Sequence, residues 1–308
     1  RLGYKTLWSH RLRSLNIPYG GVLGNVDMPV AELVFRNYKS LLRMGEVDRV
    51  WFNSIRESSP LAAVALKESK GWISQGRVPG SIHWTMSIPP SMDEFWARMK
   101  AKHRSELRRN SRRLADACGD QVVFRGFRGP GEVQTACDHV ESVAARTYLR
   151  GMGQGFQSTP ETLRRFTLSA ERDAFRAYVL YAAHKPVAYW IGECEGSVYY
   201  PTDTGYDPEF KKYEAGTLAF IFAVEELLRE GKTRFDFGFG DAGYKQYFGD
   251  ENWMDQSPSI YAPNLRCSFV RTGHTAAARL TKLSKDILDR VGRTNWVKTK
   301  WRGAFRKS

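Results

Sequence analysis

The fold is decided by YYPTDTGYDPEFKKYEAGTLAFIFAVEELLREGKTRFDFGFGDAGYKQYFG, which runs from Tyr199 to Gly249. A strand is expected over 197–204, followed by a loop, an amphipathic helix over about 215–230 and a strand over 234–238. The start of a helix carries free backbone N–H groups and the positive end of the helix dipole. The strand-loop-helix order therefore predicts an anion site at the beginning of this helix.

The loop before the helix has the residues that such a site needs. Gly216 permits a close approach of the backbone, and Lys211 and Lys212 add positive charge. Together these features favour a pyrophosphate as the bound group. The alternative interpretation is an ordinary helix start that happens to contain a glycine.

The remaining segments alternate between helical and extended patterns. Antiparallel strands followed by a strand-loop-helix-strand unit indicate a mixed α/β sheet. Ser91 and Glu94 form a capping pattern before one long helix, predicted from about Met92 to Ala117 and ending near Gly119. We further expect strands over 121–127, 175–183 and 187–193, helices over 132–148 and 160–169, and short strands or loop edges over 50–52, 61–66, 71–74 and 81–88.

The net charge of +14 is concentrated in two segments. Arg98–Arg113 holds eight Lys/Arg against one Glu, and Arg271–Ser308 holds eleven against two Asp. Within the first segment, Arg104, Arg108 and Arg112 share one helix face. This face suits an acidic sugar, a nucleotide-linked substrate or RNA, and the alternative is a solvated face that pairs with nearby acids.

The basic C-terminal segment also has an apolar stripe with aromatic residues. Basic residues combined with interfacial tryptophans predict a helix that lies on an anionic membrane, and packing of the stripe against the protein body is the alternative. The stripe over Thr275–Arg306 consists of Leu280, Leu283, Ile287, Leu288, Trp296, Trp301 and Phe305.

Several function classes find no pattern in the sequence. No apolar run reaches the roughly 18 residues of a membrane span, and Arg1–Arg13 lacks the apolar core of a signal peptide. Because the chain begins with Arg rather than Met, we expect a native N-terminal segment to be missing. The four cysteines form no CxxC pair, which favours reduced thiols in the cytoplasm. No ligand-like His spacing, Ser-His-Asp or Cys-His pattern is present, so the sequence predicts no metal site and no covalent catalysis.

The stretch GYDPEFKKYEAGTL followed by DFGFGDAGYKQYFG resembles the acyl-CoA-binding motif of GNAT acyltransferases. It is most similar to the CelD-like acetyltransferases of exopolysaccharide gene clusters, and it also resembles the Fem-type transferases that add amino acids to peptidoglycan precursors. KHRSELRRNSRRLADACGDQVVF resembles the R-x-x-x-R-R helix that links two GNAT-like halves in both groups. The likeness covers about Val50 to Gly249. The loop departs from the family pattern, because it reads Lys-Lys-Tyr-Glu-Ala-Gly instead of R-G-x-G-x.

The resemblance implies an α/β GNAT fold with tandem halves and mixed β-sheets, of which the first half is less complete. It divides the chain into a partial N-terminal half at 1–90, a basic linking helix at 91–118, an acyltransferase domain at 119–270 and a basic tail at 271–308.

The resemblance also implies a donor site. The N–H groups of Ala215, Gly216 and Thr217 would bind the phosphates of acetyl-CoA or another acyl-CoA. The segment from Asp236 to Asp241 would form the strand end and the glycine loop beneath the acyl group, where both aspartates would contact the substrate.

Catalytic roles follow by position in the same family. Tyr244 and Lys245 match the aromatic-Lys pair of the Fem-type enzymes, so Lys245 would stabilise the oxyanion and Tyr244 would protonate the leaving thiolate. Asp203 is preferred over Glu193 as the acceptor of the amine proton. The structural alternatives are that Tyr244 only packs and that Lys245 pairs with Asp241 or Asp250.

The expected function is N-acyl transfer, in the form of acetyl transfer, from acyl-CoA to an amino group of a sugar, polysaccharide precursor or cell-envelope precursor by direct attack. Arg104 and Arg108 would help to bind the acceptor. The alternatives are aminoacyl transfer from tRNA and a non-catalytic GNAT-like module in a membrane-associated assembly. We expect a cytoplasmic protein, peripheral to the inner face of the membrane if the tail binds lipid.

Overall fold

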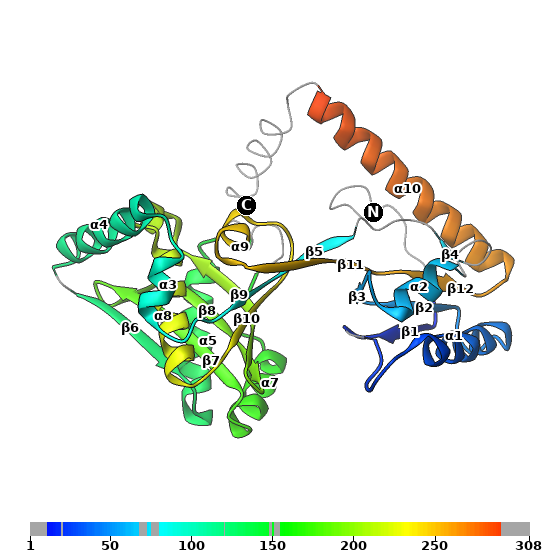
Figure 1. Cartoon of the computed structure of the whole chain (residues 1–308), viewed down its shortest axis with the longest axis horizontal. Helices are drawn as coiled ribbons and strands as arrows, with labels where there is room; N and C mark the ends of the chain where they lie inside the picture. Colours follow the sequence, from blue (N-terminus) through cyan, green and yellow to red (C-terminus); the bar gives the residue numbers. More distant parts are fainter. Residues whose placement is uncertain are drawn as a thin grey trace. The chain divides into compact units, whose positions relative to one another are not determined.

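The computed structural model describes residues 11–19, 21–67, 73–74, 80–119, 121–147, 150 and 155–290 (Figure 1). These residues form two compact units. The first contains the chain up to His83, Phe239–Ala242 and the chain from Asn252 to the end of the last helix. The second contains Trp84–Gly238 and Gly243–Glu251.

The first unit is built on a small sheet with the strand order β1-β2-β12-β4. Its apolar core includes Phe35, Phe52, Ile260 and Cys267. The elements are β1 (Ser14–Ile17), α1 (Met28–Arg43), β2 (Arg49–Phe52), β3 (Ile55–Arg56), α2 (Pro60–Lys67), β4 (Ile73–Ser74), β12 (Ser259–Tyr261) and α10 (Leu265–Arg290).

Two features of this unit differ from the sequence expectations. Residues 61–66, expected as a strand or loop edge, belong to the helix α2, because their apolar side chains pack into the core as a helical face. The strand β12 and the helix α10 return to this unit from the other end of the sequence. A continuous first half over 1–90 was predicted, whereas the observed unit is discontinuous. The tandem relationship of the two halves stays a prediction.

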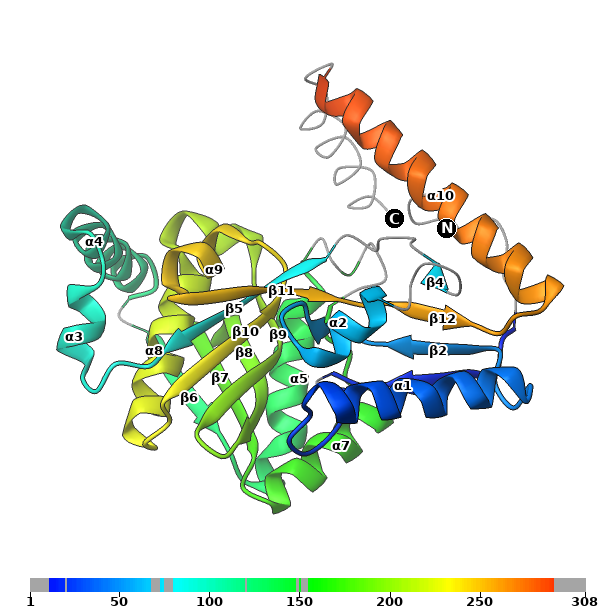
Figure 2. The same ribbon diagram turned by 45° about the vertical axis from the view of Figure 1, so that its right-hand side comes forward.

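The second unit contains most of the strands of a sheet with the order β3-β11-β5-β10-β9-β8-β7-β6, and helices cover both faces of these strands (Figure 2). Its strands from β6 to β9 pair antiparallel, and β9 pairs parallel with β10. The elements are β5 (Ser81–Ser87), α3 (Met92–Ala97), α4 (Ala101–Ala117), β6 (Val122–Phe127), η2 (Pro130–Glu132), α5 (Val133–Ala144), α7 (Pro160–Glu171), β7 (Phe175–Ala182), β8 (Lys185–Glu195), β9 (Val198–Tyr206), η3 (Pro208–Tyr213), α8 (Ala215–Arg229), β10 (Arg234–Phe239), α9 (Gly243–Phe248) and β11 (Glu251–Gln256). Of these, β5, β10 and β11 also have residues in the first unit.

The central strands of this sheet are buried on both faces, which explains their nearly continuous apolar runs. Side chains alternate between the faces, so Tyr189 and Ile191 join the cluster beneath α5 and α7. Trp190, between them, joins the cluster beneath α8. The predicted mixed α/β sheet and its strand-loop-helix-strand unit are confirmed.

The prediction of a single helix over 92–117 is wrong, because the chain forms two helices, α3 and α4, with a break between them. Lys100 is extended there, with ψ of 138°. The guanidinium of Arg104 holds the break by donating a hydrogen bond of 3.0 Å to the carbonyl of Trp96. The predicted cap is confirmed, since the Ser91 hydroxyl accepts a hydrogen bond of 3.2 Å from the Glu94 N–H. Gly119 follows the end of α4 with φ of 58°.

Candidate active site

The loop before α8 is fixed by a buried carboxylate. Asp207 accepts a hydrogen bond of 3.0 Å from the N–H of Glu209 and forms an ion pair of 3.0 Å with Arg146 of α5. Glu214 then adopts the left-handed conformation, with φ of 56°, and α8 begins at the next residue. The sequence thus builds a tight turn directly before the helix, as a loop-helix anion site requires.

Two backbone donors at this helix start have no hydrogen-bond partner among the described residues, namely the N–H groups of Ala215 and Gly216. The third predicted donor, the Thr217 N–H, already donates a hydrogen bond of 2.9 Å to the Glu214 carbonyl. Lys211 and Lys212 are exposed beside the turn. The structure therefore brings the predicted cradle together with two donors rather than three.

Gly216 has a packing role that the sequence did not reveal. A Cβ atom at this position would lie 3.0 Å from Cδ1 of Tyr206, so the glycine admits the tyrosine ring at the end of β9. Glu214 adds an opposing charge, and its carboxylate lies 3.8 Å from Nε2 of His103 on α4. An anion therefore binds at this helix start only if the attraction of the surrounding cations exceeds the repulsion of the Glu214 carboxylate.

The two parallel strands beside the cradle separate. Their ladder consists of Arg234 with Val198 and Phe235 with Tyr199, although both strands continue further. The neighbouring ladder of β8 and β9 is irregular between Ile191 and Gly192. A Cβ atom on Gly192 would lie 2.1 Å from the Tyr200 carbonyl oxygen, so only glycine fits this irregularity. Such irregularities change the direction of neighbouring side chains and are frequent beside active sites.

Asp203 lies on β9 directly beyond this irregularity. Its Oδ1 accepts a hydrogen bond of 2.6 Å from the Tyr189 hydroxyl. Burial raises the pKa of the Asp203 carboxyl, and the hydrogen bond from Tyr189 partly opposes that rise. A carboxylate whose pKa is raised is a stronger base than an ordinary one. Sequence reasoning missed Tyr189, because cross-strand partners follow only from the register.

Tyr244 presents its phenol near this carboxylate. Its ring packs edge-on against Trp190 and Phe237, with centroids 5.8 and 5.9 Å away. Burial, together with the charge of Asp203, raises the pKa of Tyr244 to about 12. The phenol is thus protonated at neutral pH and serves as a hydrogen-bond donor. Both predicted roles are compatible with this position, since the ring packs and the hydroxyl group is available.

The next residue, Lys245, is buried. Its ammonium donates a hydrogen bond of 2.7 Å to the carbonyl of Phe237 on β10, at the separating strands. Burial lowers the pKa of Lys245, and the charge of Asp236 opposes this effect. Asp236 is itself buried and accepts a hydrogen bond of 2.7 Å from the Gly238 N–H. The ammonium therefore fastens α9 to β10 in addition to any role with a substrate.

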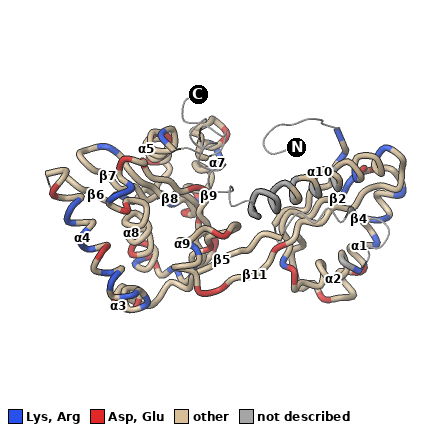
Figure 3. The backbone as a smooth tube through the Cα atoms, turned by 90° about the horizontal axis from the view of Figure 1, so that it is seen from above, with Lys and Arg blue, Asp and Glu red and all other residues tan. Residues whose placement is uncertain are grey.

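The remaining predicted site residues lie elsewhere. Asp241 is exposed and belongs to the first unit. Asp250, the structural alternative for Lys245, accepts a hydrogen bond of 2.9 Å from the Ser87 N–H and forms an ion pair of 3.5 Å with Arg98. Arg108 lies on α4 and lines a pocket described below. Lys and Arg gather along α4 (Figure 3).

Within the described residues, no three His, Cys, Asp or Glu side chains are grouped so as to hold a metal ion. None of the helices in the described ranges is long and apolar enough to cross a membrane. Trp296, Trp301 and Phe305 lie outside the described residues.

Comparisons with known proteins identify a domain and a fold for this chain. Residues 101–246 match the family model of an acetyltransferase (GNAT) domain. FemX is 10% identical, with a TM-score of 0.57 over 83% of this chain and 82% of that chain. The C-terminal domain of a putative lysylphosphatidylglycerol synthetase from Agrobacterium fabrum is 14% identical, with a TM-score of 0.54 over 90% and 82%. No match was found among curated proteins.

At such low identity the structural likenesses show the fold alone. The chain has the GNAT fold, with mixed α/β content and mixed sheets, as the sequence predicted. The domain match supports an acyltransferase that uses an acyl-CoA donor. It does not distinguish the CelD-like subfamily from other GNAT groups.

Proposed function

We propose that this protein is an N-acyltransferase that moves an acyl group from acyl-CoA to an amino group by direct attack. One observation carries the proposal. The strands β9 and β10 separate after two residue pairs, and Asp203 and Tyr244 lie near each other on the elements beside that opening. The free N–H groups at the start of α8 follow β9 by a short turn.

The proposed steps assign one task to each side chain. Asp203 accepts the proton of the attacking amine as the new C–N bond forms. The phenol of Tyr244 donates a hydrogen bond to the departing thiolate as the C–S bond breaks. With a pKa of about 12, this phenol stabilises the thiolate better than it gives up its proton. The ammonium of Lys245 supplies positive potential at the oxyanion.

The donor is proposed to be acetyl-CoA or a related acyl-CoA, with its pyrophosphate on Ala215 and Gly216. The acceptor is proposed to be an amino group of a sugar or polysaccharide precursor of the cell envelope, which rests on the resemblance to the CelD-like group. Release of free thiol from acetyl-CoA, measured with a panel of amino sugars and matched sugars that lack the amine, tests the acceptor. Equal thiol release with both sets would contradict an amine acceptor.

Calorimetry with acetyl-CoA tests the donor site. We expect Gly216→Asp to abolish binding, because a carboxylate would meet the pyrophosphate. Gly216→Ala is the matched control, since its methyl group meets the same Tyr206 ring at 3.0 Å without adding charge. If wild type and both variants bind acetyl-CoA equally well, the donor does not lie at this helix start.

The tRNA-dependent alternative rests on the basic segment Arg98–Arg113. It predicts RNA binding that weakens steeply with salt, because each neutralised phosphate releases counterions. Filter binding from low to moderate salt measures this dependence. The absence of RNA binding at low salt would favour the acyl-CoA proposal.

The basic C-terminal segment is proposed to contact an anionic membrane surface. On α10, Leu265, Phe269, Leu280 and Leu283 are exposed. Cys267 and Val270 are buried in the first unit, so a deletion should begin after Arg271. That deletion should reduce co-sedimentation with anionic vesicles, since each basic residue contributes about 1 kcal/mol there. Unchanged sedimentation would contradict the membrane contact.

A further inference from the structure

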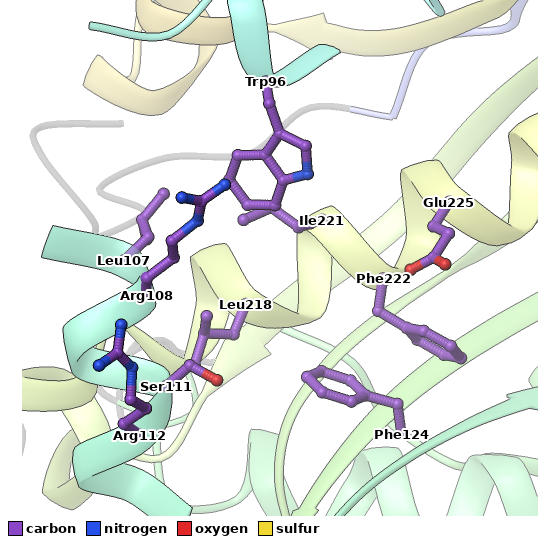
Figure 4. Close-up of a pocket in the computed structure, with 10 residues that line it drawn as sticks. All are labelled: Trp96, Leu107, Arg108, Ser111, Arg112, Phe124, Leu218, Ile221, Phe222 and Glu225. Carbon is purple, nitrogen blue, oxygen red and sulfur yellow. The ribbon is translucent and has the colours of Figure 1, made fainter. Parts of the chain in front are cut away.

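A pocket of about 400 Å³ lies between α4 and α8 in the second unit (Figure 4). Its volume is within the range of small-molecule sites, which starts at about 300 Å³. Aromatic and aliphatic side chains form most of its walls, and two arginines of α4 project toward it. The lining residues are Trp96, Leu107, Arg108, Ser111, Arg112, Phe124, Leu218, Ile221, Phe222 and Glu225.

The two arginines of the pocket differ from Arg104 and Arg109 on the same helix. Arg108 and Arg112 form no hydrogen bond and no ion pair within the described part of the chain. By contrast, Arg104 is bound to the Trp96 carbonyl and Arg109 pairs with Glu106 at 3.5 Å. Residues four apart share a helix face, so both guanidinium groups are available to one ligand.

The opposite wall does not neutralise these charges. Its acid, Glu225, forms an ion pair with Arg229 on α8. The pocket therefore combines a net positive rim with the aromatic rings of Trp96, Phe124 and Phe222. Aromatic rings stack on nucleobases, and guanidinium groups bind phosphate through paired hydrogen bonds. This combination favours a phosphorylated nucleoside over an uncharged apolar ligand.

The pocket also adjoins the proposed phosphate cradle. Leu218 lines it and lies three residues after Ala215, which is about 5 Å along the helix axis. At the same end, His103 of α4 approaches Glu214 at 3.8 Å. A ligand whose pyrophosphate lies on the first N–H groups of α8 can therefore extend into the pocket.

We propose that the α4–α8 pocket binds the 3′-phosphorylated adenosine of the acyl-CoA donor, which rests on the proposed function. Arg108 and Arg112 bind the 3′-phosphate, and the aromatic side chains contact the adenine. This assignment gives the positive charge of α4 a ligand within the same unit. It also supplies a ligand for two guanidinium groups that form no hydrogen bond or ion pair among the described residues.

Calorimetry with CoA and 3′-dephospho-CoA tests the assignment. For Arg108→Gln/Arg112→Gln we expect CoA affinity to fall roughly ten- to hundredfold, as for the loss of charge-assisted hydrogen bonds. Affinity for 3′-dephospho-CoA should be unchanged, because that ligand lacks the phosphate in question. Arg109→Gln/Arg113→Gln is the matched control, with the same spacing and charge change on residues outside the pocket. This control should bind both ligands as wild type does.

Other outcomes overturn the assignment. An equal loss of affinity for both ligands, or an equal loss in the control variant, would show a general charge effect. Unchanged CoA affinity combined with lost RNA binding in the pocket variant would make α4 an RNA contact. If wild type binds 3′-dephospho-CoA as tightly as CoA, the 3′-phosphate has no site although the proposed function stands. If wild type binds neither ligand, the proposed function fails as well.

Discussion

Replacing Asp203 by asparagine separates the catalytic role of this carboxyl from its structural role. An asparagine carbonyl still accepts the hydrogen bond that the Tyr189 hydroxyl donates at 2.6 Å, so the local geometry should persist. The general base is lost, which typically lowers turnover by about 10²- to 10⁴-fold. That loss corresponds to roughly 3–5 kcal/mol of transition-state stabilisation, since a tenfold change in rate is about 1.4 kcal/mol.

The stability of the same variant should change in the opposite sense. Burial raises the pKa of Asp203 in the folded state, so the ionised carboxylate destabilises the fold. The contribution of this group to stability is fully present below its unfolded-state pKa and is lost as the pH rises through its folded-state pKa. At neutral pH, Asp203→Asn should therefore leave the melting temperature unchanged or raise it. Thiol-release kinetics and thermal unfolding measure the two effects.

Glu193→Gln is the matched control, because it removes the same charge from the adjacent strand β8. Turnover within about threefold of wild type for Asp203→Asn would refute the assignment. A large loss for Glu193→Gln alone would transfer the role of base to that residue. Tyr189→Phe adds a second check, because losing its hydrogen bond raises the pKa of Asp203 further and moves the acidic limb of the rate profile to higher pH.

Three further substitutions test two residues beside Asp203 and one buried ion pair elsewhere in the second unit. Tyr244→Phe should lower kcat, while the melting temperature stays near that of wild type because the ring contacts persist; equal turnover would leave this tyrosine a packing residue only. Lys245→Met should lower both turnover and the free energy of unfolding, the latter by about 1–3 kcal/mol, since the Phe237 carbonyl loses a buried donor. A fall in stability without one in kcat would make Lys245 structural. Arg176→Met should lower the free energy of unfolding by about 3–5 kcal/mol, because Glu230 loses a buried partner at 2.7 Å. Denaturant titration would contradict this if the midpoint did not change.

The sequence predicted the second unit well from Val122 to Gly238, because the strands and helices there carry strong local periodicity. The short helix α9 and the strand β11 that follow were not predicted. The prediction also failed at the break between α3 and α4, where no proline or glycine marks the chain. That break depends on the contact of Arg104 with the Trp96 carbonyl, which no local pattern encodes. The helix α1 and the strand β12 were also not predicted. For α1 the local signal was present and was missed, since Asp27 caps the N–H of Val30 and a proline lies in the first turn. The strand β12 has only three residues and pairs with strands that lie far away in the sequence.

The site was predicted in part for the same reason. The motif located Tyr244, Lys245 and Gly216. The sequence explained the glycine by the close approach of a ligand, whereas the structure shows that it also makes room for the ring of Tyr206. The role of Tyr189 requires the register of β8 against β9, which brings its hydroxyl to Asp203. Contacts between strands are thus the part of the site that a single sequence does not show.

The discontinuous first unit has a consequence for synthesis on the ribosome. Its central strand β2 pairs with β12, and its core contains Ile260 and Cys267. These residues are translated only after the whole second unit has been made. The N-terminal residues must therefore wait with an unpaired strand edge and exposed apolar side chains, while the second unit can already fold. Nascent chains released before Ser259 should consequently be more susceptible to proteolysis at their N-terminal end, and chaperone binding should be concentrated there.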